Sequence, residues 1–203
     1  MARINSFELR AMNNPLRRLV QRQIELPAFE RALARLSIDL RGARVLDVGC
    51  GSGYSTELLA RHLAPSRLCA FDLMPEQVEM AMARRVPGAE IRVADVTELP
   101  YDDGSFDVAF VFGILHHVPE WRGALREIAR VLAPGGVLCV EELHGGYVRH
   151  QDRFFFTSHP PEAAFDWPSF RAGLADARLA IAREYALVPG VARGFIARRA
   201  PAA

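Results

Sequence analysis

Three glycines at alternating positions follow an apolar segment, and this pattern indicates a ligand-binding turn. The segment 45–48 reads Val-Leu-Asp-Val, and Gly49, Gly51 and Gly53 come directly after it. Such a segment predicts a buried strand, and glycines allow a tight turn in which the backbone approaches a ligand closely. Residues 54–60 then predict a helix whose free N–H groups face the same point. The arrangement is typical of a site for a nucleotide-like cofactor.

The spacing of the glycines differs from that of a dinucleotide site. The pattern Gly-x-Gly-x-x-Gly would require a glycine at position 54, which is Tyr54 here, whereas Gly53 comes one residue early. A carboxylate at Asp47 would also repel a pyrophosphate in this turn, but it suits a ligand that carries an ammonium group. The turn therefore argues against a nicotinamide cofactor.

Acidic residues follow the next two predicted strands. Asp72 lies about 20 residues beyond the glycine turn, the distance expected of an acid that binds ribose hydroxyls. The alternative role for Asp72 is to cap the helix that begins near Pro75. Asp95 follows the third predicted strand and precedes Val96, and its alternative role is that of a turn residue.

Several motifs in order resemble those of the class I S-adenosylmethionine (SAM)-dependent methyltransferases. They are the glycine turn, Asp72-Leu73-Met74, Asp95-Val96, and the segments 99–107, 112–119 and 126–136. The resemblance is continuous from about residue 43 to 142, and it is closest to the ubiquinone-biosynthesis-like branch that acts on small molecules. It implies that SAM is bound, with S-adenosylhomocysteine as product, by Asp47, Gly49, Gly51, Gly53, Asp72, Leu73, Met74, Asp95, Val96, Phe112 and Gly113.

The order of the predicted elements indicates an α/β fold, because strands and helices alternate from Arg44 onward. We expect strands at 44–48, 67–72, 89–94, 106–112, 136–142, 180–187 and 193–199, and helices at 55–63, 75–84, 121–131 and 168–177. The short join at 188–191 predicts that the last two strands form an antiparallel hairpin. The resemblance implies a Rossmann-like seven-stranded sheet of order 3-2-1-4-5-7-6, with strand 7 antiparallel and helices on both faces.

The N-terminal residues 1–40 are predicted to form a helical cap on a SAM-binding domain at 41–203. Asn14 and Pro15 predict the start of a helix, and a second helix is expected at 28–36. The helix at 15–26 is amphipathic, with most of its arginines away from a shared face that holds Leu16, Leu19, Val20, Gln23 and Ile24.

The candidate catalytic residues are His116 and His117, which follow the fourth strand, and Glu142, at the end of the fifth. Methyl transfer from a sulfonium is an in-line displacement, so positioning supplies much of the rate, and a general base is needed only for a protonated acceptor. Packing or hydrogen bonding is the alternative role for the two histidines.

We expect no metal site, because no His-x-x-x-His pair or helical Glu-x-x-His spacing is present. His150 and His159 lie in the segment 143–167, which we expect to be a mobile, acceptor-side insertion. Its aromatic residues either line an apolar acceptor pocket or attach the loop to the core; they are Phe154, Phe155, Phe156, Phe165 and Trp167.

Composition gives few further constraints. The 25 basic residues, all arginine, and 24 acidic residues leave a net charge of +1, which offers no electrostatic argument for a nucleic-acid partner. Cys50, Cys69 and Cys139 look like buried residues of a reducing compartment. With no signal peptide or membrane-length apolar run, we expect a cytoplasmic protein. The basic helix at 15–26 leaves contact with an anionic membrane surface as an alternative to capping.

The sequence therefore predicts an enzyme that transfers the methyl group of SAM to an O, N or C atom of a small organic acceptor, apolar and quinone- or natural-product-like. The alternatives are a phospholipid or membrane-surface N-methyltransferase and a SAM-binding protein without methyl transfer. The sequence leaves the acceptor and the oligomeric state open.

Overall fold

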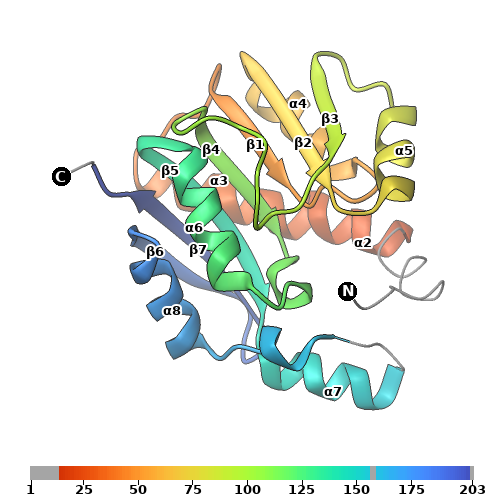
Figure 1. The fold of residues 1–203 in the computed structure, drawn as a ribbon, viewed down its shortest axis with the longest axis vertical. Helices are drawn as coiled ribbons and strands as arrows, with labels where there is room; N and C mark the ends of the chain where they lie inside the picture. The colour runs from red at the N-terminus through yellow and green to blue at the C-terminus, as the bar shows by residue number, and fades with distance from the viewer. Residues whose placement is uncertain (1–13, 156–158, 202–203) are drawn as a thin grey trace.

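The computed structural model describes residues 14–155 and 159–201, which form an α/β structure around a seven-stranded sheet. The strands are β1 (Arg44–Val48), β2 (Arg67–Asp72), β3 (Ala89–Val93), β4 (Phe106–Phe112), β5 (Leu132–Leu143), β6 (Leu179–Val188) and β7 (Ala192–Arg199). Their order is β3-β2-β1-β4-β5-β7-β6 (Figure 1). The first five strands pair in parallel, and β7 is antiparallel to both β5 and β6. The predicted fold class is confirmed.

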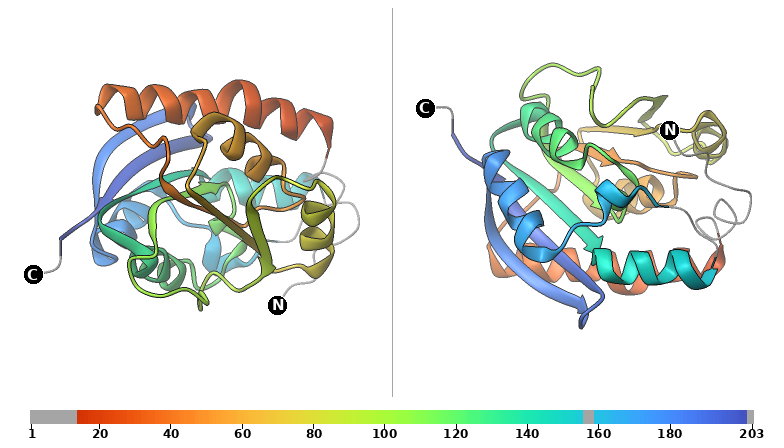
Figure 2. Two further views of the ribbon diagram at one scale, coloured as in Figure 1. Left: turned by 90° about the horizontal axis from the view of Figure 1, so that it is seen from above. Right: turned by 60° about the horizontal axis from the view of Figure 1, so that its bottom comes forward.

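Helices cover both faces of the sheet (Figures 1 and 2). One face carries α6 (Trp121–Val131) and α8 (Trp167–Asp176), and the other carries α3 (Leu26–Arg35), α4 (Tyr54–Leu63) and α5 (Pro75–Ala83). The helix α7 (Gly145–Phe155) lies below the carboxyl ends of the strands in Figure 1. Two short 3-10 turns, η2 (Leu115–His117) and η3 (Pro161–Ala163), complete this end of the molecule.

Alternate residues of the central strands enter opposite cores. In β4, Ala109 and Val111 pack with α6 and α8, whereas Phe110 and Phe112 pack against Phe29 of α3 with ring centroids 5.8 and 5.5 Å away. Each such aromatic contact contributes about 0.5–1.5 kcal/mol beyond its buried area. Because β4 is buried on both sides, its carboxyl end is held firmly, and so are the residues that follow it.

The N-terminal helices form one continuous helical run rather than the two predicted helices. The helix α2 (Pro15–Val20), a π-helical segment η1 (Gln21–Glu25) and α3 follow one another without a break. Asn14 caps the start as predicted, because its side chain accepts a hydrogen bond from the backbone N–H of Arg17 at 2.8 Å. Pro27 does not separate two helices, since it lies in the first turn of α3, where η1 has already interrupted the regular hydrogen bonding.

The π-helical segment also explains why the amphipathic face differs from the one expected. Leu16, Leu19 and Ile24 are 67%, 53% and 45% exposed, whereas the side chain of Arg17 turns toward the sheet. The extra residue in a π-turn rotates the preceding helix by about 100° relative to the rest. The apolar face of α2 therefore does not continue into the buried face of α3.

A helix occupies part of the segment that the sequence predicted to be a mobile loop, so that prediction was wrong at His150, which lies on α7. Gly145 and Gly146 form the first turn of this helix. A Cβ atom on Gly145 would lie 2.4 Å from the carbonyl carbon of Ala164, so only glycine fits there. The imidazole of His144 accepts a hydrogen bond from the N–H of Gly146 at 3.0 Å.

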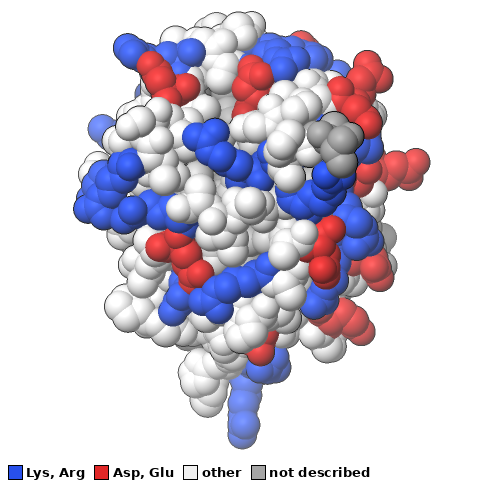
Figure 3. Space-filling model, turned by 90° about the vertical axis from the view of Figure 1, so that its left-hand side faces the viewer, with Lys and Arg blue, Asp and Glu red and all other residues white. Residues whose placement is uncertain are grey.

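Charges of both signs lie on the surface. On the face shown in Figure 3, acidic side chains lie among the arginines and break up the positive areas. Within residues 14–155 and 159–201, no helix has both the length and the hydropathy needed to cross a membrane.

Candidate functional site

A pocket of about 600 Å³ opens at the carboxyl ends of the parallel strands, the edge at which open α/β sheets bind ligands. Its walls come from the N-terminal helical run, the glycine turn, the ends of β4 and β5, α7 and the β6–β7 turn. The pocket joins the predicted cofactor side to the predicted acceptor side. Of the predicted site residues, it is lined by Gly49, Gly51, Phe112, Gly113, His116, His117 and Glu142.

The glycine turn has the conformation and the open space that the sequence indicated. Gly49, Gly51 and Gly53 have φ angles of 66°, 52° and 78°, a region that favours glycine. A Cβ atom on Gly51 would meet only Oε1 of Gln77, at 4.0 Å, so the space in front of this residue is free for a ligand. Gly53 does not line the pocket; a Cβ atom there would lie 2.8 Å from that of Ala81, so helix packing requires this glycine.

Asp47 lies beneath the turn rather than on the pocket wall. Its Oδ2 accepts hydrogen bonds from the hydroxyls of Ser55 and Thr56, both at 2.7 Å. Its Oδ1 is buried and has no hydrogen-bond partner among the described residues. Burial raises the pKa of Asp47 to about 6, against the effect of the two hydroxyl hydrogen bonds. The carboxyl group is therefore held rigidly, with one oxygen unsatisfied.

Asp72 connects the end of β2 to the glycine turn. Its Oδ2 accepts a hydrogen bond from the N–H of Gly51 at 2.9 Å, and its Oδ1 accepts one from the N–H of Met74 at 2.9 Å. Burial raises the pKa of this carboxyl group. Met74, not Asp72, occupies the N-cap position of α5, and Leu73 and Met74 are half-buried. Whether these residues contact a ribose or an adenine stays a prediction.

Asp95 and Val96 point in different directions. Asp95 is exposed and accepts hydrogen bonds from the backbone N–H and the hydroxyl of Thr97, at 2.8 and 2.7 Å. This is the geometry of its alternative role as a turn residue. Val96 is buried in the core beneath α6 and α8. Neither residue lines the pocket, so their predicted contact with the cofactor is also untested.

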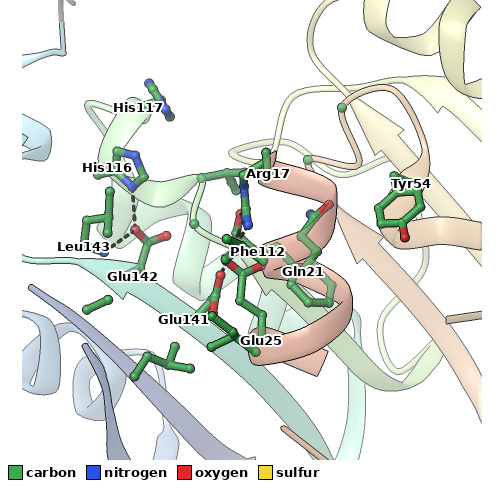
Figure 4. Close-up of a pocket in the computed structure, with 18 of the residues that line it drawn as sticks. Arg17, Gln21, Glu25, Tyr54, Phe112, His116, His117, Glu141, Glu142 and Leu143 are labelled. Carbon is green, nitrogen blue, oxygen red and sulfur yellow. Dashed lines mark hydrogen bonds and ion pairs between the residues drawn. The ribbon is translucent and has the colours of Figure 1, made fainter. Parts of the chain in front are cut away.

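On the predicted acceptor side of the pocket, His116 and Glu142 form a close pair, which is drawn in Figure 4. Nδ1 of His116 lies 2.7 Å from Oε2 of Glu142, and Oε1 of Glu142 accepts a hydrogen bond from the N–H of Leu115 at 2.6 Å. Both side chains are buried. Burial lowers the pKa of His116 to about 3 and raises that of Glu142 to about 8.

His117 lies next to this pair, with its ring centroid 4.3 Å from that of His116. Burial also lowers the pKa of His117 well below its usual value. A neutral imidazole is the form that accepts a proton or binds a metal ion. The structure therefore places the three predicted catalytic candidates in one cluster at the pocket wall.

An ionic cluster that the sequence did not reveal ties the N-terminal helix to the sheet. Arg17 forms an ion pair with Glu25, and its Nη2 lies 3.7 Å from Oε1 of Glu141 at the end of β5 (Figure 4). Glu25 and Glu141 are both buried. Burial and the nearby charge of Glu25 raise the pKa of Glu141 well above its usual value. These residues are far apart in the sequence, so no spacing indicated them.

His159 is another residue of the pocket wall, and it lies in a segment without regular secondary structure beyond α7. Its ring packs on that of His117 with a centroid separation of 4.5 Å, and its Nδ1 lies 2.5 Å from Oδ1 of Asp152 on α7. It lines the same pocket.

The aromatic residues of the insertion divide between core and surface. Phe165 and Trp167 are buried in the core with α6 and α8, which is the second of the two roles expected of them. Phe154 is 58% exposed. The side chain of Phe155 and all of Phe156 lie outside the described part of the chain.

The comparison of the sequence with known families gives a match over the center of the sheet. Residues 46–140 match the family model described as a methyltransferase domain. The probable phthiotriol/phenolphthiotriol dimycocerosates methyltransferase 2 of Mycobacterium ulcerans (strain Agy99) is 37% identical over 106 residues, covering 52% of this chain and 41% of the relative. The ubiquinone biosynthesis O-methyltransferase of Xanthomonas oryzae pv. oryzae (strain PXO99A) is 40% identical over 111 residues, covering 53% and 46%. The matches span less than half the length of these curated relatives.

Solved structures extend the similarity to almost the whole fold. The crystal structure of a SAM-dependent methyltransferase from Aquifex aeolicus has a TM-score of 0.74 and 20% identity, covering 96% of this chain and 98% of that chain. At this identity the likeness shows the fold. Residues 46–140 thus match the methyltransferase domain model, and the chain shares the Rossmann-like fold of the SAM-dependent methyltransferase from Aquifex aeolicus.

Proposed function

We propose that this protein transfers the methyl group of SAM to a small, apolar organic acceptor. The observation that supports the proposal most directly is that the glycine turn and the His116–Glu142 pair open onto the same pocket. Cofactor and acceptor would thus be held within one cavity, which is what an in-line displacement requires.

The residues present fit SAM on two observations. The space in front of Gly51 is one that a side chain would fill, and Asp47 holds a buried oxygen without a partner just beneath the turn. We expect the turn and Asp47 to hold the methionine part, and Asp72 the ribose. SAM supplies an electrophilic methyl group when bound. The chain itself contributes position, exclusion of water and, for a protonated acceptor, a place for the proton.

On the acceptor side, His116 is the better oriented of the two candidate bases, because Glu142 fixes its ring. Leu143, Leu187, Val188 and Val191 add apolar wall to the pocket. These residues favour an apolar acceptor that presents one polar atom toward the histidines. The names of the two relatives refer to phthiotriol/phenolphthiotriol dimycocerosates and to ubiquinone biosynthesis, and they support this class of acceptor.

The helical run from Pro15 to Arg35 would act as a cap over the cofactor, since Arg17 and Gln21 line the pocket. A cytoplasmic location remains part of the proposal and is consistent with three free cysteines.

A methyl-transfer assay tests the proposal. The protein is incubated with SAM labelled in its methyl group and with separate quinone, phenol, phospholipid and amine substrates. We expect label in the quinone or phenol products, and none with a Gly51→Val variant. Label in phospholipid alone would instead indicate the membrane-surface alternative. If calorimetry shows that S-adenosylhomocysteine binds but no substrate class becomes labelled, the protein binds SAM for a function other than methyl transfer.

A further inference from the structure

Three histidines from two distant segments converge on the wall of the pocket. His116 and His117 follow β4, and His159 lies beyond α7. One ring nitrogen of each lies within 4.8 Å of those of the other two. The ring centroids are 4.3 Å apart for His116 and His117, 4.5 Å for His117 and His159, and 5.4 Å for His116 and His159. No spacing rule could reveal this cluster, because His159 is far from His116 and His117 in the sequence.

Carboxylates orient two of the three rings. Nδ1 of His116 contacts Glu142 at 2.7 Å, and Nδ1 of His159 contacts Asp152 at 2.5 Å. When Nδ1–H donates to a carboxylate, Nε2 keeps its lone pair and its direction is fixed. This carboxylate–histidine arrangement is what usually surrounds a metal-bound histidine. The cluster thus has both a set of possible ligands and the groups that would orient them.

We propose that His116, His117 and His159 bind a divalent transition-metal ion, with Glu142 and Asp152 as orienting partners. Three imidazoles favour zinc, cobalt, nickel or copper over magnesium or calcium, which prefer oxygen ligands. Three protein ligands leave a fourth position of a tetrahedral ion free, as in catalytic zinc sites. All three histidines line the pocket, and this position would be accessible from its interior.

The fourth ligand would be an oxygen atom, either of water or of the acceptor hydroxyl. Binding of the acceptor hydroxyl rests on the proposed methyl transfer, whereas binding of water does not. A hydroxyl bound to the metal loses its proton to solvent water more readily, and the oxygen that remains is the nucleophile. The metal would then replace an imidazole as the means of removing that proton. This differs from our expectation from the sequence that no metal is bound.

A metal titration tests the site without cofactor or acceptor, so its outcome is independent of the proposed function. Tag-free protein, stripped with a chelator, is titrated with Co²⁺, whose visible bands report four-coordinate geometry, and then with Zn²⁺ in competition. We expect one equivalent of Co²⁺ with these bands, displaced by Zn²⁺. His117→Ala and His159→Ala should each weaken binding by more than about 100-fold. Circular dichroism reports whether each variant is folded.

His150→Ala is the matched control, because His150 lies on α7 against Phe154 and outside the cluster; it should bind Co²⁺ like the wild type. Asp152→Asn keeps the three histidine ligands and should weaken Co²⁺ binding roughly 10–100-fold. This variant tests the role of His159 if His159→Ala does not fold. Absence of four-coordinate Co²⁺, or equal affinity in the wild type and all of these variants, would overturn the proposal.

Discussion

Nη2 of Arg17 donates a hydrogen bond to the carbonyl oxygen of Phe112 at 3.2 Å and so joins the N-terminal helix to the end of β4. The same guanidinium lies between the carboxylates of Glu25 and Glu141. A single cation therefore offsets two buried acids at the pocket wall. Its loss would leave these acids without their counter-charge, which is costly in a buried site.

Arg17→Met should therefore reduce the free energy of unfolding by roughly 1.5–3 kcal/mol and weaken S-adenosylhomocysteine binding. Adding Glu25→Gln to the variant should recover much of the stability, because one of the two acids is removed. Urea unfolding and calorimetry measure the two effects. Arg22→Met, at an exposed position of the same helical run, is the control. Equal stability of the two single variants would contradict the role given to Arg17.

Gly51→Val should abolish S-adenosylhomocysteine binding, because the side chain fills the space in front of the turn. The control is Gly42→Val, since Gly42 also has a positive φ angle, of 71°, with nothing near its Cβ position. Both variants should lose about 1–2 kcal/mol of stability from backbone strain. Only the variant at Gly51 should lose the ligand; similar affinities in the two would refute the site.

The sequence predicts the central part of this fold well because local rules decide it. Strand β4 is continuously apolar from Val108 to Phe112, as burial on both faces requires, and the glycine turn needs positive φ angles that only glycine adopts easily. The parallel order then follows from the resemblance. These elements depend little on distant contacts.

The parts that the sequence predicted poorly depend on contacts between distant segments. The π-helical turn at Gln21–Glu25 changes which face of α2 is buried, and no local pattern marks it. Gly145 begins a helix, and the backbone of Ala164 packs so closely against it that no Cβ atom fits there. The cluster of His116, His117 and His159 likewise depends on where α7 ends. In each of these three cases, contacts between distant segments determine the structure, and the local sequence pattern does not indicate it.

Asp72→Ala should weaken S-adenosylhomocysteine binding by about 1.5–3 kcal/mol, the contribution of a charge-assisted hydrogen bond. The carboxylate both supports Gly51 and, in our proposal, binds ribose. Calorimetry with S-adenosylhomocysteine and with methionine separates these two roles, since only the first ligand has a ribose. Asp103→Ala, at an exposed acid paired with Arg130, is the control. An affinity like that of the control would exclude Asp72 from the site.

Stability should depend on pH through Asp47. Its pKa is raised from 3.8 to about 6 in the folded protein, so the folded state binds a proton more tightly than the unfolded state. The stabilisation is present below pH 4 and is lost as pH rises to about 6, with a total change of about 3 kcal/mol. Urea unfolding from pH 4 to 7 should therefore show the stability of the wild type falling by this amount relative to that of Asp47→Asn. Asp39→Asn should show a constant difference, because the pKa of Asp39 is held at about 2 by Arg41.

The acceptor-side histidines should affect turnover and not cofactor affinity. His116→Gln and His117→Gln should lower kcat by about 10²–10⁴-fold, the usual effect of losing a general base, while S-adenosylhomocysteine binds as before. His150→Gln should leave both quantities unchanged. Treatment with a chelator distinguishes the two ways in which the histidines can act: an imidazole base keeps its turnover, whereas the metal site loses it and regains it with Zn²⁺. Unchanged kcat in both of the first two variants would show that these histidines serve packing alone.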